Sequence, residues 1–205
     1  MDEATGTPDD IEPADIYAYK PSLIGGAWIL RLAPDGLHWS MGALSGRVAY
    51  DSIRSIRLSF RPVTMQSYRF LAEVRADTRL KIPIASASWK SIMEQGRQDE
   101  AYSRFIKALH AKIAEAGGTP RLQAGAIAFL YWPGLLVFAG ICVAMIALMV
   151  RAIQQRETAA LLFLFGFFLV VLWQLGMFFK RNLPRRYTLD AIPPDVLPAP
   201  KTGAA

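Results

Sequence analysis

The chain has 205 residues, of which 53% are hydrophobic and 20% charged, and its mean hydropathy is +0.23. Soluble domains are about 45–50% apolar and about 25% charged, so this composition excludes a wholly soluble single domain and a disordered chain. The excess is local, because residues 122–150 and 158–179 contain no Asp, Glu, Lys or Arg. Two such segments exclude a large polytopic transporter, and the single cysteine excludes a disulfide framework and a cysteine-rich zinc site.

The formal net charge of +6 is the sum of −6 over residues 1–15, +8 over residues 16–121 and +4 over residues 122–205. An acidic start lacks the positive region of a secretory signal peptide, so no cleaved signal is expected. Residues 1–18 are predicted to be a disordered acidic tail, which either only solvates the chain or shields the basic domain behind it.

Residues 19–118 are predicted to form a soluble domain rich in β-strands. Apolar and polar residues alternate along short runs, which predicts at least six strands, near residues 28–32, 37–41, 47–50, 56–60, 68–75 and 80–85. Ala33-Pro34-Asp35-Gly36 has the composition of a turn, as does the stretch from Gly42 to Gly46. Pro83 favours an edge position for the last of these strands.

One amphipathic helix is predicted to follow the strands. Asp99 is a candidate N-cap, and Gly117-Gly118 and Pro120 end the helix. Its apolar residues recur at spacings of three and four and form one stripe: Tyr102, Phe105, Ile106, Leu109 and Ile113. A strand meander leaves an open end, and this helix is suited to cover it.

Strands followed by one terminal helix of this kind resemble the pleckstrin-homology (PH) superfold, in particular bacterial PH-like domains. The residues that carry the resemblance are Leu30-Arg31-Leu32, residues 35–39, residues 48–53 and the helix from Tyr102 to Leu109. The resemblance implies an α+β fold, with a partly open antiparallel β-barrel or sandwich capped by a C-terminal helix. PH domains that bind phosphoinositides have a basic first hairpin loop, whereas residues 33–36 contain no base, so that site is not implied here.

Residues 122–150 and 158–179 are predicted to be transmembrane helices, because about 20 apolar residues cross a bilayer. Residues 151–157 form the turn between them, and the chain beyond, 180–205, is first basic and then rich in proline. Seven basic residues flank the outer ends, against Arg151 and Arg156 in the turn. The positive-inside rule therefore places both termini in the cytoplasm and the protein in the inner membrane. The proline-rich tail is expected to be extended, either passive or a peptide ligand.

Neither span contains an ionisable side chain, which argues against a proton relay or an ion path. Candidate residues for packing between helices, or between copies of the chain, are Gly140, Ala144, Gly166, Gln174 and Gly176. Cys142 is interpreted as an apolar filler.

No catalytic constellation is evident. His38 and His110 have no metal-ligand spacing to a cysteine or second histidine, and no phosphate-binding or nucleophile motif occurs. The sequence thus predicts no enzyme activity, metal or cofactor. Nucleic acid is not expected either, because neither a basic helix nor interleaved aromatic residues are present.

The distinctive surface feature is basic. A group of strand residues is interpreted either as a solvated sheet face or as a contact for anionic headgroups: Arg47, Arg54, Arg57, Arg61, Arg69, Arg75, Arg79 and Lys81. Four juxtamembrane residues are further candidates for contact with lipid phosphates: Lys180, Arg181, Arg185 and Arg186.

Three functions follow from these observations. The first is a non-catalytic, membrane-anchored PH-like module that binds a protein partner, or its own copies, at the cytoplasmic face. The second is a sensor of anionic lipids that uses the arginine-rich face. The third is an accessory subunit of a membrane enzyme or transporter.

Overall fold

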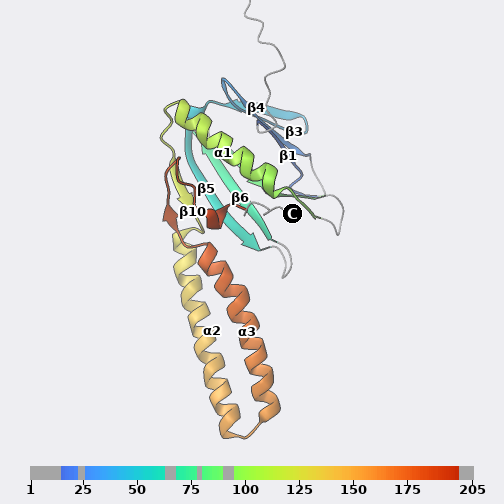
Figure 1. The fold of residues 1–205 in the computed structure, drawn as a ribbon, viewed down its shortest axis with the longest axis vertical. Coiled ribbons are helices and arrows are strands. Elements are labelled where there is room, and N and C mark those ends of the chain that lie inside the picture. The colour runs from blue at the N-terminus through green and yellow to red at the C-terminus, as the bar shows by residue number, and fades with distance from the viewer. Residues whose placement is uncertain (1–14, 23–25, 63–67, 78–79, 90–94, 199–205) are drawn as a thin grey trace, which may run out of the picture.

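The computed structural model describes residues 15–22, 26–62, 68–77, 80–89 and 95–198. The structure is of the α+β class: two open β-sheets and one helix form a domain, and a hairpin of two long helices projects from one end of it (Figure 1). The core lies between the inner faces of the sheets and the first helix.

The first sheet is antiparallel and its strands follow chain order: β1 (Ile16–Tyr19), β2 (Trp28–Ala33), β3 (Gly36–Met41) and β4 (Leu44–Val48). The predicted turn between β2 and β3 is confirmed. Gly36 has a φ of +144°, and a Cβ there would lie 2.5 Å from the carbonyl oxygen of Val48, so only glycine fits. β4 begins at Leu44, inside the stretch that was predicted to be a turn.

The second sheet has the order β11-β10-β5-β6-β7. Its strands are β5 (Ile53–Pro62), β6 (Tyr68–Ala76), β7 (Lys81–Ala85), β10 (Arg121–Ala124) and β11 (Arg185–Arg186). β7 lies at the edge, as Pro83 predicted. A 3-10 turn, η1 (Tyr50–Ser52), joins the sheets, and β8 (Ala87–Trp89) pairs with β9 (Gln95–Arg97). Across the described ranges the two sheets stay open, so closure into a barrel is not observed.

The amphipathic helix is confirmed as α1 (Asp99–Glu115), with Gln98 rather than Asp99 at the N-cap position. All five residues of the predicted stripe are fully buried. Figure 1 shows α1 crossing over the strands of the domain.

The domain begins earlier than predicted. Residues 16–18 were assigned to the disordered tail, but they belong to β1, while residues 1–14 lie outside the described part of the chain. Tyr17 and Tyr19 alternate with exposed neighbours and are each only 2% exposed. The Tyr17 hydroxyl donates a 2.6 Å hydrogen bond to the carbonyl oxygen of Ala85. Burial of these two rings offsets the entropy that ordering the strand costs.

The first apolar helix begins later than predicted. Residues 122–124 were assigned to the membrane span, but they lie in β10, which runs parallel to β5. Leu122 and Ala124 point into the core and pair with Ile56 and Leu58. The first residues of this apolar run therefore belong to the core of the domain and not to the helix.

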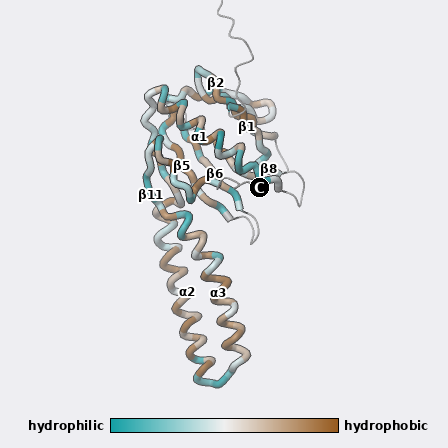
Figure 2. The backbone as a smooth tube through the Cα atoms, viewed as in Figure 1, coloured by the Kyte–Doolittle hydropathy of each residue, from teal (hydrophilic) through white to brown (hydrophobic). Residues whose placement is uncertain are grey.

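The two long apolar helices are α2 (Ala128–Gln154) and α3 (Thr158–Arg181). At 1.5 Å per residue they measure about 40 and about 36 Å, enough to cross about 30 Å of hydrocarbon. Both are long and apolar enough to span a membrane, and their side chains are largely exposed. Figure 2 shows the hairpin as predominantly hydrophobic, with a hydrophilic tip at the turn.

The segment after the hairpin differs most from expectation. Residues 182–198, here called the C-terminal strap, fold back onto the domain through β11 and a 3-10 turn, η2 (Pro194–Val196). Val196 and Leu197 are buried in the core. The hydroxyl of Tyr187 lies 2.9 Å from Nε2 of the buried His110 on α1. The predicted extended tail is thus a structural element, because its scattered apolar residues have a core to enter.

Candidate functional site

The hairpin joins the second sheet through a buried polar connection. Where β10 ends, the backbone N–H of Gly125 donates to the carbonyl of Leu58 at 2.8 Å. The Asn182 side chain then takes over the edge of β5: its Oδ1 accepts from the backbone N–H of Phe60 at 3.1 Å, and its Nδ2 donates to the carbonyl of Phe178 at 3.1 Å. Asn182 is 1% exposed, so leaving these groups unpaired is costly.

Gly125 allows the two chain segments to approach each other. Its φ is +86°, and a Cβ there would lie 2.4 Å from the Leu183 carbonyl oxygen and 2.6 Å from that of Asn182. The backbone N–H of Ala126 donates to the Asn182 carbonyl at 2.9 Å. Gly125 and Asn182 therefore set the position of the hairpin relative to the sheet.

One face of the second sheet is basic. Side chains alternate along each strand, so the residues that flank the inward Ile56 and Leu58 lie on the opposite, outer face. A single register row crosses all five strands of this face, in the order Pro83, Glu73, Arg57, Gln123, Arg186. The adjoining register pairs include Arg75 with Lys81 and Arg61 with Arg69. Glu73 is the one carboxylate in these positions.

The outer face and the top of the hairpin enclose a pocket of about 540 Å³, here called the junction cleft. The sheet contributes its basic wall: Arg57, Arg61, Arg75 and Lys81, with Ser59 and Glu73. The hairpin contributes a largely apolar wall that includes Ile127, Leu130, Tyr131, Phe178 and Phe179. Cations thus face apolar side chains at the end of the domain from which the two long apolar helices leave.

The cations of the junction cleft differ in how far they are already paired. Glu73 lies 2.8 Å from Nζ of Lys81 and 3.6 Å from a guanidinium nitrogen of Arg61. Arg57 donates to the side-chain oxygen of Gln123. Among the described residues no carboxylate pairs with Arg75, whose side chain is exposed. The cleft therefore keeps positive charge available to a ligand.

The apolar wall remains open to solvent. Ile127 is 47% exposed and Leu130 66% exposed. Tyr131 is buried and donates a 3.2 Å hydrogen bond to the carbonyl of Phe179, which ties the start of α2 to the end of α3. Exposed apolar residues beside a row of arginines suit a ligand that is apolar at one end and anionic at the other.

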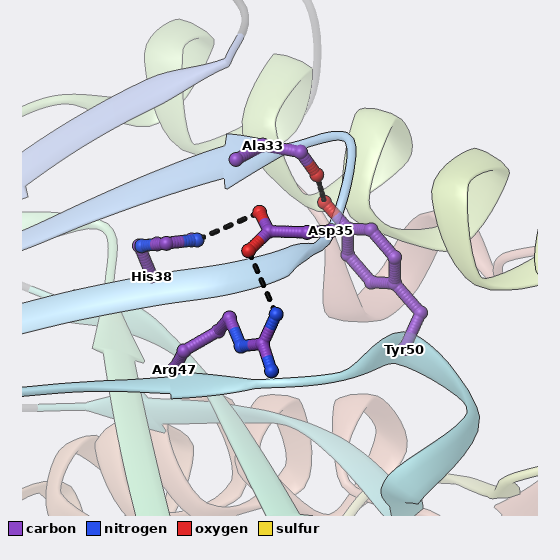
Figure 3. A network of polar contacts seen from close by, with 5 residues as sticks. All are labelled: Ala33, Asp35, His38, Arg47 and Tyr50. Atoms are coloured by element: carbon purple, nitrogen blue, oxygen red, sulfur yellow. Dashed lines mark hydrogen bonds and ion pairs between the residues drawn. The ribbon is translucent and has the colours of Figure 1, made fainter. Parts of the chain in front are cut away.

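Three other basic residues of the predicted group do not line the cleft: Arg47, Arg54 and Arg69. Arg47 on β4 forms an ion pair with Asp35 at 2.9 Å, and Arg54 pairs with Asp77. Figure 3 shows Asp35 held between Arg47 and His38 at the turn after β2. The hydrogen bond from Arg47, followed by that from His38, lowers the pKa of Asp35 to about 2. Arg69 adjoins Arg61 across the strands, with a buried Nε that has no hydrogen-bond partner, and Arg79 lies outside the described residues.

The four basic residues that follow the second apolar helix also differ in whether they are paired. Arg181 lies over the ring of Phe60, 4.8 Å from its centroid, and Arg185 pairs with Asp195 at 2.5 Å. Lys180 and Arg186 are exposed and have no ion-pair partner within the described ranges. Arg185 and Arg186 lie beside Arg57 in a second pocket, on the other side of that arginine.

Most of the predicted helix-packing residues have no close neighbour on the other helix. Gly140, Gly166 and Gly176 each have open space where a Cβ would be, and Ala144 is exposed. Gln174 is half-buried, with an Oε1 that has no hydrogen-bond partner in the described part of the chain. Self-association through these positions stays a prediction.

Neither histidine lies in a metal-binding cluster: the described residues contain no group of three or more His, Cys, Asp or Glu able to hold a metal ion. His38 contacts Asp35 at 2.8 Å at the surface. His110 was expected to be half-buried but is 2% exposed. Burial lowers the pKa of His110, although the hydrogen bond with the Ile106 carbonyl opposes this.

Comparison of the chain with protein-family models, with curated proteins and with solved structures gives no match.

The sequence patterns did not indicate the residues whose contacts with distant parts of the chain form the site. Gly125 lies within the first apolar segment and Asn182 follows the second, and neither position carries a local signal for a buried junction. Glu73 has no sequence feature that distinguishes it from other surface acids. For the strap a signal was present: Leu189, Ile192, Val196 and Leu197 give the proline-rich run more apolar residues than a solvated tail needs.

Proposed function

We propose that this protein is a non-catalytic, membrane-anchored module that binds anionic lipid headgroups of its own bilayer in the junction cleft. The observation that carries the proposal is the pairing of a basic sheet wall with an exposed apolar wall at the root of two membrane-length helices. A lipid headgroup and its acyl chains present the same two chemistries in the same order.

Electrostatics supports this function. The cleft is lined by four cations and one carboxylate, and each basic residue near an anionic membrane surface contributes about 1 kcal/mol of attraction. If both termini face the cytoplasm, as the positive-inside count predicts, the cleft lies at the cytoplasmic leaflet. The hydrogen bonds of Asn182 and Gly125 fix the sheet directly to the ends of the hairpin, so that the cleft stays next to the two long helices.

The PH-like interpretation belongs to the same proposal. Two groups of antiparallel strands and the β8–β9 pair precede one helix that packs on the core. Strands followed by one terminal helix are what the resemblance implied. The proposed lipid site lies on the outer face of β5, β6 and β7, away from the first hairpin loop. That loop, with Asp35 held between His38 and Arg47, has no free cation.

The test uses the full chain purified in a neutral detergent, with bound lipid counted by native mass spectrometry after exposure to equal amounts of phosphatidylglycerol and phosphatidylcholine. The wild type is expected to retain phosphatidylglycerol in clear preference. Arg57→Gln with Arg75→Gln removes two cations from the cleft and should lower that preference about 30-fold, since each basic residue contributes about 1 kcal/mol.

The matched control removes the same charge elsewhere, with Arg47→Gln and Arg54→Gln. This double variant should retain lipid as the wild type does, because both side chains lie outside the cleft. Equal loss in the two double variants, no preference in the wild type, or recovery of a stoichiometric protein partner in place of lipid would overturn the proposal.

A further inference from the structure

The junction cleft adjoins a second basic pocket. This lateral cleft has a volume of about 340 Å³ and is lined by Arg57, Gln123, Ala124, Ala126, Ala128, Pro184, Arg185 and Arg186. It shares Arg57 and Ala126 with the junction cleft. Arg57 thus forms part of the wall of both.

Within the described part of the chain, each cleft has one arginine without an ion-pair partner besides the shared Arg57. In the junction cleft, Glu73 engages Lys81 and Arg61, which leaves Arg75. In the lateral cleft, Asp195 engages Arg185, which leaves Arg186. The remaining positive charge is therefore in two places, not one.

The spacing of these arginines follows from the sheet. Arg75 lies on β6 and Arg186 on β11, three strand positions apart, with Arg57 on β5 between them. At about 4.8 Å per strand the outer two backbones are about 14 Å apart. Their long side chains can reach inward to two anions that flank Arg57.

The start of α2 adds to the charge of the lateral cleft. Ala128, in the first turn of this 27-residue helix, lines it, and that turn contains no acidic residue. The positive end of the helix dipole therefore supplements Arg186. This is a supporting contribution, since the arginines define the site.

We infer that the preferred ligand is a lipid with two phosphate groups joined by a short bridge, one phosphate in each cleft and Arg57 between them. This inference rests on the proposed function and narrows its ligand class. A headgroup with one phosphate satisfies either Arg75 or Arg186 and leaves the other unpaired. The exposed Ile127 and Leu130 beside the junction cleft then contact the acyl chains.

The experiment offers the detergent-solubilised full chain diphosphatidylglycerol, twice the molar amount of phosphatidylglycerol, and phosphatidylcholine, so that phosphates and acyl chains are matched. Native mass spectrometry counts retained lipid. Diphosphatidylglycerol should be retained about tenfold over phosphatidylglycerol. Arg186→Gln should lower that ratio about fivefold, the effect of one basic residue at a membrane surface, and leave phosphatidylglycerol bound.

Further arms identify the source of the two phosphates. A monophosphorylated phosphatidylinositol in place of diphosphatidylglycerol tests an inositol bridge, and its stronger retention would assign the site to that bridge. Pyrophosphate tests the anion alone and should not displace bound lipid. Arg75→Gln should lower the ratio as Arg186→Gln does, and Arg47→Gln should not.

The failures are distinguishable. Equal retention of diphosphatidylglycerol and phosphatidylglycerol by the wild type overturns the two-phosphate inference and leaves the proposed function standing. Retention of neither above phosphatidylcholine overturns both. An Arg186→Gln variant that loses both anionic lipids equally, or full displacement by pyrophosphate, also overturns the inference.

Discussion

Surface arginines inside and outside the junction cleft are similar in kind but differ in how they are paired. Arg47 on the first sheet, beside Asp35, and Arg54 at the start of β5, beside Asp77, are engaged in ion pairs. The outer face of the second sheet places a single carboxylate, Glu73, among its cations. Whether an arginine is available to a ligand thus depends on the residue opposite it, not on the local density of basic residues.

A second difference concerns surroundings. β4, which carries Arg47, lies at the end of the domain away from the hairpin (Figure 1). The outer face of the second sheet instead meets α2 and α3. A cation near exposed apolar helices is suited to an amphiphilic ligand, while the same residue in an ion pair at the far end mainly keeps the surface soluble. The predictions that follow test this contrast.

The largest expected effect is that of Gly125→Ala. The new Cβ would clash with two carbonyl oxygens at a positive φ, so we expect a loss of roughly 3 kcal/mol in unfolding free energy. Thermal unfolding followed by near-ultraviolet circular dichroism measures it. Lipid retention in the junction cleft should fall as well, because the hairpin shifts relative to the sheet.

Gly117→Ala is the matched control for this variant. Gly117 also has a positive φ, +67°, but a Cβ there would meet open space. It should lose only about 1 kcal/mol, the conformational cost alone, and retain lipid normally. An equal loss of unfolding free energy in both variants would show that the close approach at Gly125 is not important for stability.

The next largest effect is expected in the C-terminal strap. Leu197→Ala removes a buried side chain from the core and should cost about 2–3 kcal/mol. Leu183→Ala removes the same atoms from a side chain that is 45% exposed and should cost under about 0.5 kcal/mol. Thermal melts compare the two, and equal melting temperatures would mean that the strap does not stabilise the domain.

A smaller effect is predicted for pH, through the buried His110. The groups that face it are Tyr187, at 2.9 Å, and Lys107 and Asp190, which line the adjoining pocket. Its pKa is lowered in the folded state, so below about 6.5 the unfolded chain binds more protons than the folded one. Stability should therefore fall as the pH drops through that value, and stay level above it as far as this group is concerned.

His110→Gln removes this titration and should flatten the dependence between pH 7.5 and about pH 5.5 in thermal melts. A slope as steep as that of the wild type would show that other groups cause it.

The smallest effect is expected for Asp35→Asn. The ion pairs of Asp35 are exposed, and such pairs contribute little to stability, so the melting temperature at neutral pH should not change measurably. The freed Arg47 should bind no additional lipid, since it lies far from the hairpin. A gain in lipid retention would break the contrast between the two regions.

Elements encoded by local sequence patterns were predicted correctly, whereas contacts between distant residues were not. The strands, the stripe of α1 and the two apolar helices were predictable because each is encoded in local periodicity or in an uninterrupted apolar run. Leu122 and Ala124 were misassigned because two inward strand positions next to an apolar helix look like the helix itself. Asn182 gave no signal because Phe60, whose backbone it contacts, is 122 residues away in the chain. Glu73 gave none because its partners, Arg61 and Lys81, lie on the two neighbouring strands.

By itself the sequence determined that the molecule consists of a strand-rich domain with one amphipathic helix and a pair of long apolar helices. Charge-free runs of membrane length, alternating strands and one amphipathic stripe are local patterns, and the hydrophobic effect acts on them directly. Tertiary structure decided which arginines stay unpaired, that two clefts share Arg57, and that the proline-rich end is part of the core. Those outcomes depend on strand register and on close approach at Gly125, which bring distant residues into contact and which no local pattern specifies.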